Sequence, residues 1–242
     1  MRFITLSNRP MDDDADSSIR RQPRMLRESA AAFGVPLENI CPLGAAHDWT
    51  GGARRAMVLD YLAGVDDEEP VLLTDAWDSF FAGTPEEMEA AFRGLGAAVA
   101  IQTECNLWPV ETAHLMRHPP APTRFQYACG GGWCGFAGAL RAMFTAADFW
   151  PPWACCDQAA FDDWLCRHDT ARLDYHCRLF QCMYDDGTSG PPLGGVFRVE
   201  GGRMRNIETD SFPLVWHGGG GFAVEAARLW EKLKEQRGWR YP

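Results

Sequence analysis

The sequence predicts a single α/β domain, and three features of the chain support this prediction. Short apolar runs alternate with amphipathic stretches over most of the 242 residues, a pattern typical of strands that alternate with helices. Residues 70–74, PVLLT, are almost entirely apolar, as in a strand that is buried on both faces. A helix pattern at 83–96 and another apolar run at 97–104 follow, so the three segments predict a parallel β-α-β unit.

The helix of this unit is marked at both ends by residues that commonly cap helices. Thr84 is a predicted N-cap, Pro85 occupies the first helical position, and Glu87 completes a capping box. Gly96 can adopt the left-handed backbone conformation that often ends a helix. The segment DAWD at 75–78 is therefore expected in a loop at the carboxyl end of the preceding strand.

The remaining elements continue the alternation, with no internal repeat, linker or low-complexity tract. Before the unit, the sequence predicts a strand at 2–7, a helix at 17–34 interrupted by Pro23, a short strand at 35–43 and a helix at 51–64. After it come a Gly-rich run at 129–136, helices around 137–149 and 157–168, short strands at 178–183, 194–199 and 212–218, and a final amphipathic helix at 222–238.

Charge and hydropathy exclude several classes of function. The net charge of −10 and the pI near 5.0 argue against a nucleic-acid partner, because binding a polyanion requires a concentrated basic surface. No stretch approaches the roughly 20 apolar residues of a membrane-spanning helix. The N-terminal segment turns acidic after a short apolar run, unlike a signal peptide. We therefore expect a cytoplasmic protein without a membrane span.

The chain contains nine cysteines, an odd number, and none of them shows the CxxC spacing of a zinc knuckle. Free cysteine is among the residues most often buried, so we expect mainly buried free thiols. Disulfides or a structural metal remain the alternatives. The cysteines are Cys41, Cys105, Cys129, Cys134, Cys155, Cys156, Cys166, Cys177 and Cys182.

Asp75 and Asp78 stand where ligands bind in open α/β sheets, at the carboxyl end of a predicted parallel strand. Two carboxylates at this spacing can direct oxygens toward one point, and hard cations such as Mg²⁺ or Mn²⁺ prefer oxygen ligands. Acidic pairs also close turns, so the spacing by itself leaves a turn role open. Trp77 between them is either a core residue or a platform on which a planar base stacks.

His217 ends another apolar run and is followed by four glycines, residues 218–221, before a helix begins near Phe222. Backbone N–H groups of such a turn can approach phosphate closely, although neither the P-loop nor the dinucleotide fingerprint is present. A lone histidine at a strand end is more often structural, but beside Asp-x-x-Asp it becomes a candidate third metal ligand. Asp157 opens a predicted helix, either as an N-cap or as a functional carboxylate.

Five motifs, in the same order, resemble the glycosyltransferase domain of the procollagen lysyl hydroxylases. VLLTDAWDSFFAGTPEEMEAAF resembles a strand that leads into Asp-x-x-Asp and a helix start, and QTECNLWP resembles a Ser-Ala-Glu segment that ends in aromatic-Pro. GGGWCGFAGAL is similar to a Ser-Gly-Gly-Phe-x-Gly run. DQ followed by LDYHCRLFQ, and NIETDSFPLVWHGGGG with its His-Gly ending, complete the series. The resemblance covers roughly residues 49–221.

The resemblance implies a GT-A-type nucleotide-sugar fold, with a mixed, mostly parallel central sheet flanked by helices. It further implies a metal-dependent transfer of glucose or galactose from a UDP-sugar to a hydroxyl acceptor. Asp75, Asp78 and His217 would hold Mn²⁺ or Mg²⁺, and Asp157 would act on the donor sugar or the acceptor. The implied nucleotide-sugar-binding residues are Trp77, Thr50, Gly51, Arg54, Arg55, Glu104, Gly131, Gly132, Gln158, Gly218, Gly219 and Gly220.

This sequence also departs from the family pattern. Cys129 stands where the family tends to have a polar residue, WACC replaces the acidic run before Asp157, and Gly219 stands for Asn. The metal and nucleotide end is therefore better matched than the sugar and acceptor end. The acceptor, whether a sugar, a peptide or a small molecule, stays open. An alternative function is a non-catalytic nucleotide-sugar-binding or interaction domain of the same fold.

Overall fold

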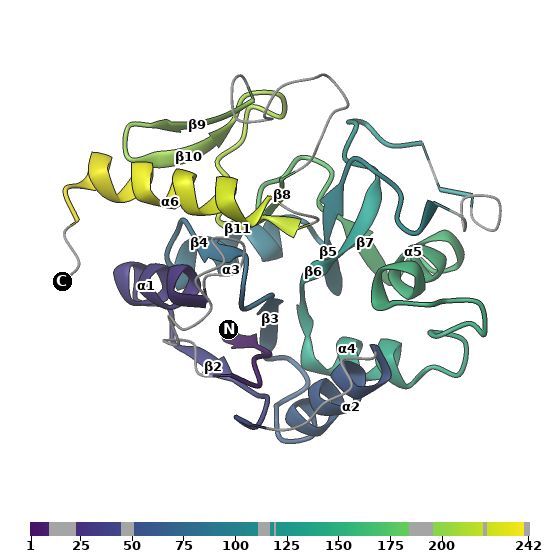
Figure 1. Ribbon diagram of the computed structural model, residues 1–242. Helices are drawn as coiled ribbons and strands as arrows, with labels where there is room; N and C mark the ends of the chain where they lie inside the picture. The colour runs from purple at the N-terminus through teal and green to yellow at the C-terminus, as the bar shows by residue number, and fades with distance from the viewer. Residues whose placement is uncertain are drawn as a thin grey trace.

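A six-stranded sheet lies at the centre of the molecule, and a three-stranded sheet and a two-stranded hairpin lie beside it (Figure 1). The computed structural model describes residues 1–9, 23–44, 51–110, 117–118, 120–183, 196–219 and 222–239. The large sheet contains, in spatial order, β2 (Leu37–Asn39), β1 (Arg2–Thr5), β3 (Pro70–Thr74), β6 (Tyr127–Phe136), β5 (Val99–Glu104) and β7 (Ala171–Leu173). The small sheet contains β4 (Ser79–Phe81), β11 (Val215–His217) and β8 (Phe180–Cys182), and the hairpin contains β9 (Phe197–Glu200) and β10 (Arg203–Asn206).

The predicted mixed, mostly parallel sheet is confirmed. β1 runs parallel to both β2 and β3, and β5 runs parallel to β7. β6 lies antiparallel between β3 and β5, so the predicted β-α-β unit keeps its parallel direction although its two strands are not neighbours. The Gly-rich run at 129–136, to which the sequence assigned no strand, makes up most of β6.

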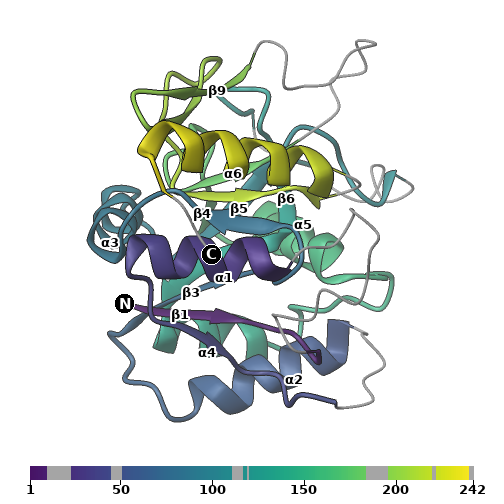
Figure 2. The same cartoon turned by 60° about the vertical axis from the view of Figure 1, so that its left-hand side comes forward.

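Helices cover both faces of the large sheet (Figure 2), and two apolar clusters fill the interfaces. On β3, Leu72 belongs to one cluster while Val71 and Leu73 belong to the other, as expected from the period of two in a strand. The first cluster includes α1 (Pro23–Phe33), α3 (Pro85–Gly94), α6 (Ala223–Arg237) and the small sheet. The second includes α2 (Gly51–Leu62), α4 (Ala137–Thr145) and α5 (Asp157–Arg167).

The predicted capping of α3 is present in full. The Thr84 hydroxyl accepts a hydrogen bond from the Glu87 backbone at 3.3 Å, and the Glu87 carboxylate accepts one from the Thr84 backbone at 2.9 Å. Gly96 has φ of 61°, the left-handed conformation expected after the helix. At the other predicted interruption, Pro23 is the first residue of α1, where its missing N–H costs no helical hydrogen bond.

Aromatic side chains attach α6 to the small sheet. The ring of Phe80 on β4 lies between Trp216 of β11, with centroids 6.1 Å apart, and Trp230 of α6, with centroids 5.8 Å apart. All three side chains are fully buried. Each such pair contributes about 1 kcal/mol beyond the burial of its apolar area. The apolar side of α6 therefore holds the small sheet against the rest of the fold.

Asp174 fixes the start of β8. Its carboxylate is fully buried and accepts hydrogen bonds from the backbone N–H groups of Arg178, Leu179 and Phe180 at 3.0, 2.7 and 2.9 Å. Burial raises the pKa of this carboxyl, although the three backbone donors oppose that effect. Asp174 is thus a structural residue of the LDYHCRLFQ motif, and it sets the position at which β8 joins β11.

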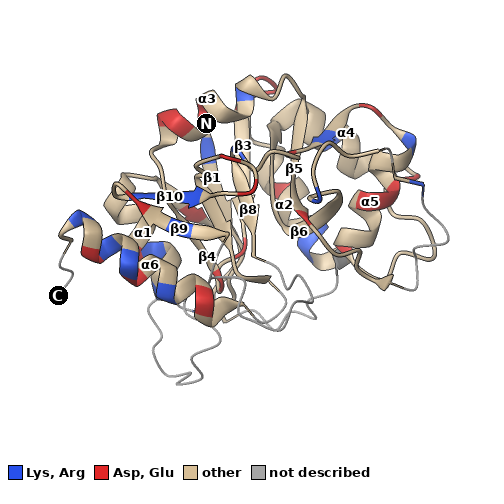
Figure 3. Cartoon of the chain, turned by 90° about the horizontal axis from the view of Figure 1, so that it is seen from above, with Lys and Arg blue, Asp and Glu red and all other residues tan. Residues whose placement is uncertain are grey.

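Acidic and basic residues are interspersed along α6, and Figure 3 shows them as red and blue segments of the helix ribbon. Arg24, Lys234 and Glu28 pair where α6 meets α1, with Glu28 accepting from Arg24 at 2.6 Å and from Lys234 at 3.1 Å. Among the helices that the structure describes, none combines the length and the apolar character needed to traverse a bilayer.

Candidate functional site

Asp75, Asp78 and His217 meet at the junction of the two sheets. Nε2 of His217 lies 3.3 Å from Oδ1 of Asp78 and 3.6 Å from Oδ2 of Asp75. One donor atom from each of the three residues lies within 4.8 Å of the other two. The structure therefore brings together the three predicted ligands, which are up to 142 positions apart in the chain (217 − 75).

The Asp-x-x-Asp segment connects the large sheet to the small one. Asp75 directly follows β3, and its backbone N–H donates to the Gly131 carbonyl of β6 at 3.0 Å. Asp78 directly precedes β4, and its carbonyl accepts from the Gly218 N–H at 2.7 Å. One carboxylate is thus anchored to each sheet.

Strand register in the small sheet places His217 at this junction. His217 is paired with Ser79 of β4 on one side and with Cys182 of β8 on the other. The residue before Ser79 is Asp78, so pairing of the strands also brings the imidazole to the second carboxylate. His217 is buried, with 4% of its surface exposed, and its ring direction is consequently set by its neighbours.

Glycines are required around the His217 ring. A Cβ on Gly131 would lie 2.1 Å from Cε1 of His217, and a Cβ on Gly219 would lie 2.8 Å from the same atom. Both distances are shorter than side chains tolerate, so the imidazole occupies space that any other residue at these positions would fill. A Cβ on Gly130 would lie 2.9 Å from Oδ1 of Asp157. Gly132 faces elsewhere, toward Gln102 and Phe180.

Arg54 links Asp75, one of the candidate metal ligands, to Asp157. Its Nη2 donates to Oδ1 of Asp75 at 2.8 Å, and its Nη1 lies 3.0 Å from Oδ2 of Asp157. Arg54 belongs to α2 and Asp157 is the first residue of α5, so the guanidinium joins two helices to the end of β3. Burial raises the pKa of Asp75 above its ordinary value, and the nearby Arg54 charge only partly offsets this effect.

The charge of His217 depends on the same carboxylates. Burial lowers the pKa of His217, but the neighbouring Asp78 and Cys129 outweigh burial and raise the pKa well above its ordinary value. A protonated imidazole would add to the Arg54 guanidinium in offsetting part of the negative charge of Asp75, Asp78 and Asp157.

Glu104 and Gln158 form a second polar pair beside the first. The Gln158 amide donates to Oε1 of Glu104 at 2.6 Å, and Oε1 of Gln158 accepts from the Gly130 N–H at 3.4 Å. Burial raises the pKa of Glu104 to about 8. Both predicted residues therefore lie close to the glycine segment of β6.

The remaining predicted nucleotide-sugar residues occupy less defined positions. Trp77 is half-buried, and the guanidinium carbon of Arg9 lies 6.0 Å from the centre of its ring. The guanidinium carbon of Arg55 lies 5.9 Å from the centre of the Phe149 ring, outside the carboxylate group. Gly51 is the first residue of α2. Thr50 and Gly220 lie outside the described residues.

The donor atoms of Asp75, Asp78 and His217 suit a hard divalent cation. Two carboxylates and one imidazole nitrogen are ligands that Mn²⁺ and Mg²⁺ accept, and three protein ligands leave coordination positions for a substrate. A small cavity of about 30 Å³ adjoins Arg54 and Asp157. A larger cavity of about 600 Å³ lies elsewhere, between the ends of α3, α5 and β7, and shares no residue with the site.

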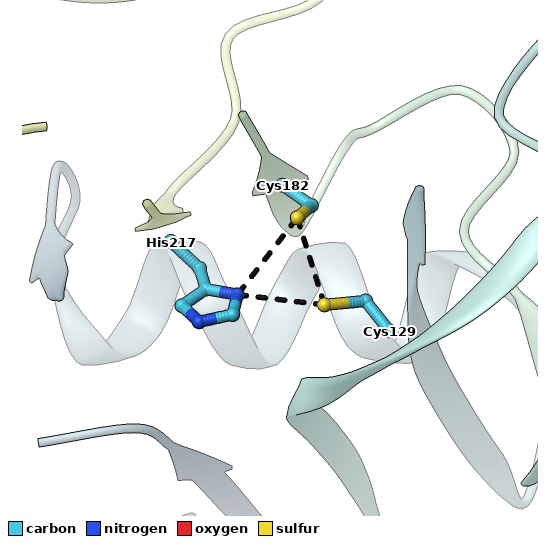
Figure 4. A group of neighbouring side chains, drawn as sticks. All are labelled: Cys129, Cys182 and His217. Carbon is cyan, nitrogen blue, oxygen red and sulfur yellow. Dashed lines mark hydrogen bonds between the residues drawn. The ribbon is translucent and has the colours of Figure 1, made fainter. Parts of the chain in front are cut away.

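Sequence reasoning did not predict a second group of side chains around His217. Sγ of Cys129 and Sγ of Cys182 lie 3.4 and 3.9 Å from Nδ1 of His217 (Figure 4), whereas the carboxylates lie beside Nε2, the other ring nitrogen. The cysteines are 53 positions apart on β6 and β8, so no local spacing could have indicated their contact.

None of the nine cysteines forms a disulfide in the structure, and their burial is not uniform. Cys155 is exposed, and Cys105, Cys156 and Cys166 are half-buried. The buried cysteines are Cys41, Cys129, Cys134, Cys177 and Cys182.

Comparisons with known proteins agree with this architecture. A family model described as the PLOD GT domain matches residues 24–236. The chain is 25% identical over 215 residues to mouse procollagen-lysine,2-oxoglutarate 5-dioxygenase 1, covering 81% of this chain and 28% of that protein. It is 25% identical over 197 residues to the human multifunctional procollagen lysine hydroxylase and glycosyltransferase LH3, covering 74% and 26%. It is 26% identical over 177 residues to the uncharacterized protein R699 of Acanthamoeba polyphaga mimivirus, covering 70% and 35%.

The chain thus spans 35% or less of the length of these relatives. Among solved structures, it is similar to a glycosyltransferase involved in the glycosylation of the major capsid of PBCV-1. The TM-score is 0.50 at 10% identity, and the match covers 96% of this chain and 100% of that one. At this identity the likeness concerns the fold alone.

Proposed function

Because the chain belongs to the PLOD GT domain family, we propose that this glycosyltransferase-type domain is a metal-dependent hexosyltransferase. The donor in this proposal is a UDP-sugar carrying glucose or galactose, and the acceptor supplies a hydroxyl group. The convergence of Asp75, Asp78 and His217 at the junction of the two sheets is the observation that carries the proposal. The hydroxylase activity in the names of the relatives is not carried over.

The three converging side chains would hold Mn²⁺, or Mg²⁺ in its place. A divalent cation there supplies Lewis-acid stabilisation of the diphosphate that leaves with UDP. The chain's own contribution is to hold Asp75 and Asp78 at a separation set by two different sheets. Glycines that admit the His217 ring keep the third donor in place.

Asp157 is the best-placed carboxylate for acting on the sugar or the acceptor. Its Oδ2 lies 3.0 Å from Nη1 of Arg54, and the same guanidinium donates to Asp75, one of the candidate metal ligands. From this position it serves either as a base for the acceptor hydroxyl or as a stabiliser of positive charge that develops on the sugar. Arg54 is a positioning residue in both cases.

The nucleotide would lie against Trp77 and the turn after β11. The Trp77 ring is half-buried, so one part of it is available for stacking on uracil. Gly218 and Gly219 follow His217 directly, and backbone N–H groups without side chains can approach a diphosphate closely.

Calorimetric titration with UDP, with and without Mn²⁺, tests the metal and nucleotide parts together. We expect UDP affinity to rise at least tenfold with Mn²⁺ in the wild-type chain and to be insensitive to Mn²⁺ in Asp78→Asn. Asp60→Asn, which removes an exposed carboxylate on α2, is the matched control and should behave as wild type. Metal-independent UDP binding by the wild-type chain would refute the metal assignment.

A donor-hydrolysis screen with UDP-glucose and UDP-galactose then separates the enzyme from the alternative. Release of UDP with either donor supports the hexosyltransferase. Metal-dependent binding of UDP without turnover of any donor, in the presence of diverse hydroxyl acceptors, would instead identify a non-catalytic nucleotide-sugar-binding domain.

A further inference from the structure

Cys129, Cys182 and His217 form a compact buried group on the far side of the imidazole from Asp75 and Asp78. The two Sγ atoms are 3.6 Å apart, and they lie 3.4 and 3.9 Å from Nδ1 of His217 (Figure 4). The exposed fractions of the three residues are 3, 1 and 4%. Three elements, β6, β8 and β11, each contribute one of these residues.

These distances match the edges of a tetrahedral zinc site. With Zn–S near 2.3 Å and Zn–N near 2.0–2.1 Å, tetrahedral angles place two sulfurs about 3.8 Å apart and a sulfur about 3.6 Å from the nitrogen. The corresponding distances here are 3.6 Å, and 3.4 and 3.9 Å. A cation could therefore enter among the three atoms with little rearrangement of the strands.

The chemistry of the donors separates this group from the carboxylate site. Thiolates are soft ligands that select Zn²⁺ and similar cations, whereas Asp75 and Asp78 suit Mn²⁺ or Mg²⁺. The two nitrogens of His217 face the two groups separately, Nε2 toward the carboxylates and Nδ1 toward the thiols. A cation on Nδ1 leaves the proton of the neutral ring on Nε2, which then donates to the carboxylates, and both nitrogens bind metal together only when the ring has lost both protons.

Charge balance explains how a cation could be tolerated at such a buried position. Binding requires both cysteines as thiolates and Nδ1 of His217 without its proton, so the protons that these three groups carry are released to solvent, and the two thiolates then neutralise the charge of a divalent ion. An additional anionic donor nearby is the Glu104 carboxylate, whose Oε2 lies 3.9 Å from Sγ of Cys182. Glu104 or a water molecule would complete four-coordination.

We propose that Cys129, Cys182 and Nδ1 of His217 bind one thiophilic divalent cation of the Zn²⁺ class, next to the carboxylate site. The proposal does not rest on the proposed glycosyl transfer, although the two sites share His217. The bound cation would secure β6 to β8 and β11 behind the histidine and hold the ring in the orientation that presents Nε2 to Asp75 and Asp78.

The experiment is a Co²⁺ titration of the fully reduced chain, in the presence of excess Mg²⁺ to occupy the carboxylates. Cobalt bound by thiolates in a tetrahedral site gives a sulfur-to-metal charge-transfer band and strong visible absorption, whereas cobalt at a carboxylate-rich site gives neither. We expect these bands to saturate at about one equivalent of Co²⁺ and to disappear when Zn²⁺ is added.

Variants assign the bands to residues. Cys129→Ser and Cys182→Ser should each lose the charge-transfer band, while Cys134→Ser, a buried cysteine on the same strand as Cys129, should retain it. Asp78→Asn should also retain it, which separates this site from the carboxylate site. Circular dichroism of each variant establishes whether it is folded. For any variant that is not, the rate at which the buried thiols of the wild-type chain react with a thiol reagent replaces it, and Zn²⁺ is expected to slow the reaction of two of them.

Two results would overturn the proposal. The first is a reduced wild-type chain that shows no charge-transfer band with excess Co²⁺. The second is a band that persists in the Cys129→Ser, Cys182→Ser double variant.

Discussion

Gly131 lies so close to His217 that a Cβ at this position would be 2.1 Å from the imidazole Cε1. A central strand of a sheet is an unfavourable place for glycine, because glycine offers no side chain for packing and loses more conformational freedom than other residues. The position is explained by the histidine, whose ring fills the space that a side chain would occupy.

Gly131→Ala should therefore displace the ring and abolish Mn²⁺-dependent UDP binding, with a loss of stability of about 1–3 kcal/mol from overpacking. Calorimetry and thermal unfolding measure the two effects. Gly94→Ala is the matched control: Gly94 is exposed at the end of α3 with no heavy atom within 4 Å of a new Cβ. It should keep UDP binding and gain up to about 1 kcal/mol from helix propensity. Normal UDP binding by Gly131→Ala would show that the ring position is not required.

Arg54→Ala should make the metal-free chain less stable and its stability more dependent on Mn²⁺. The change removes the positive charge held between Asp75 and Asp157, so the two carboxylates repel each other without a cation to offset their charge. A divalent cation restores that charge, so Mn²⁺ should raise the Tm of the variant more than that of wild type. Arg55→Ala, one position along α2, should show the wild-type Mn²⁺ response. An equal response in all three chains would contradict the bridging role of Arg54.

Asp157→Asn should leave the Kd for UDP with Mn²⁺ within about threefold of wild type and reduce donor turnover by at least about 10²-fold, the usual range for a positioned acid or base. Coupled detection of released UDP measures turnover. Asp169→Asn, an exposed carboxylate beyond the end of α5, should retain full activity. Turnover unchanged by Asp157→Asn would assign catalysis to another group.

Glu28→Gln should lower the free energy of unfolding at neutral pH and lose this effect in acid. Burial raises the pKa of Glu28, but hydrogen bonds from Trp230, Arg24 and Lys234 lower it overall below the ordinary value of 4.5. A carboxyl with a lowered folded-state pKa contributes stability above its unfolded pKa and loses that contribution as pH falls through the folded value. Denaturant unfolding should show a difference of about 1–2 kcal/mol at pH 7 that shrinks below about pH 4.5.

The exposed Glu235 of α6 provides the control for the acid effect. Glu235→Gln should have little effect on stability at any pH, since surface charges contribute little. A Glu28→Gln difference that stays constant down to pH 3 would mean that the carboxylate charge is not what stabilises the contact between α1 and α6.

Local signals predicted much of the fold. The capping box at Thr84 and the left-handed conformation of Gly96 each depend on only a few neighbouring residues, and both are present as expected. β6 was not predicted because its glycines lower strand propensity, and one of them, Gly131, is explained by a histidine on another strand. Tertiary contact explains this strand where local propensity does not.

In the candidate site, too, short sequence segments predicted some features, whereas contacts between distant segments were missed. Asp75, Asp78 and His217 were identified from strand ends and from a family resemblance that the PLOD GT domain match confirms. Their metal-binding role stays a prediction, as do the roles of the nucleotide-sugar residues. The Cys129–Cys182 contact was not predicted because it joins β6 of the large sheet to β8 of the small sheet, and no single-segment pattern reveals how the two sheets meet.

The position of Asp75 and Asp78 on two separate sheets has a mechanical consequence. Asp75 follows the end of β3 and Asp78 precedes the start of β4. A cation that binds both carboxylates would therefore hold the large sheet and the small sheet together at their junction. Amide hydrogen exchange in β4 and β11 should then be slower when the metal is bound. The exchange rate would report metal occupancy without any spectroscopic signal from the ion. Donor binding and the rigidity of the small sheet would rise and fall together.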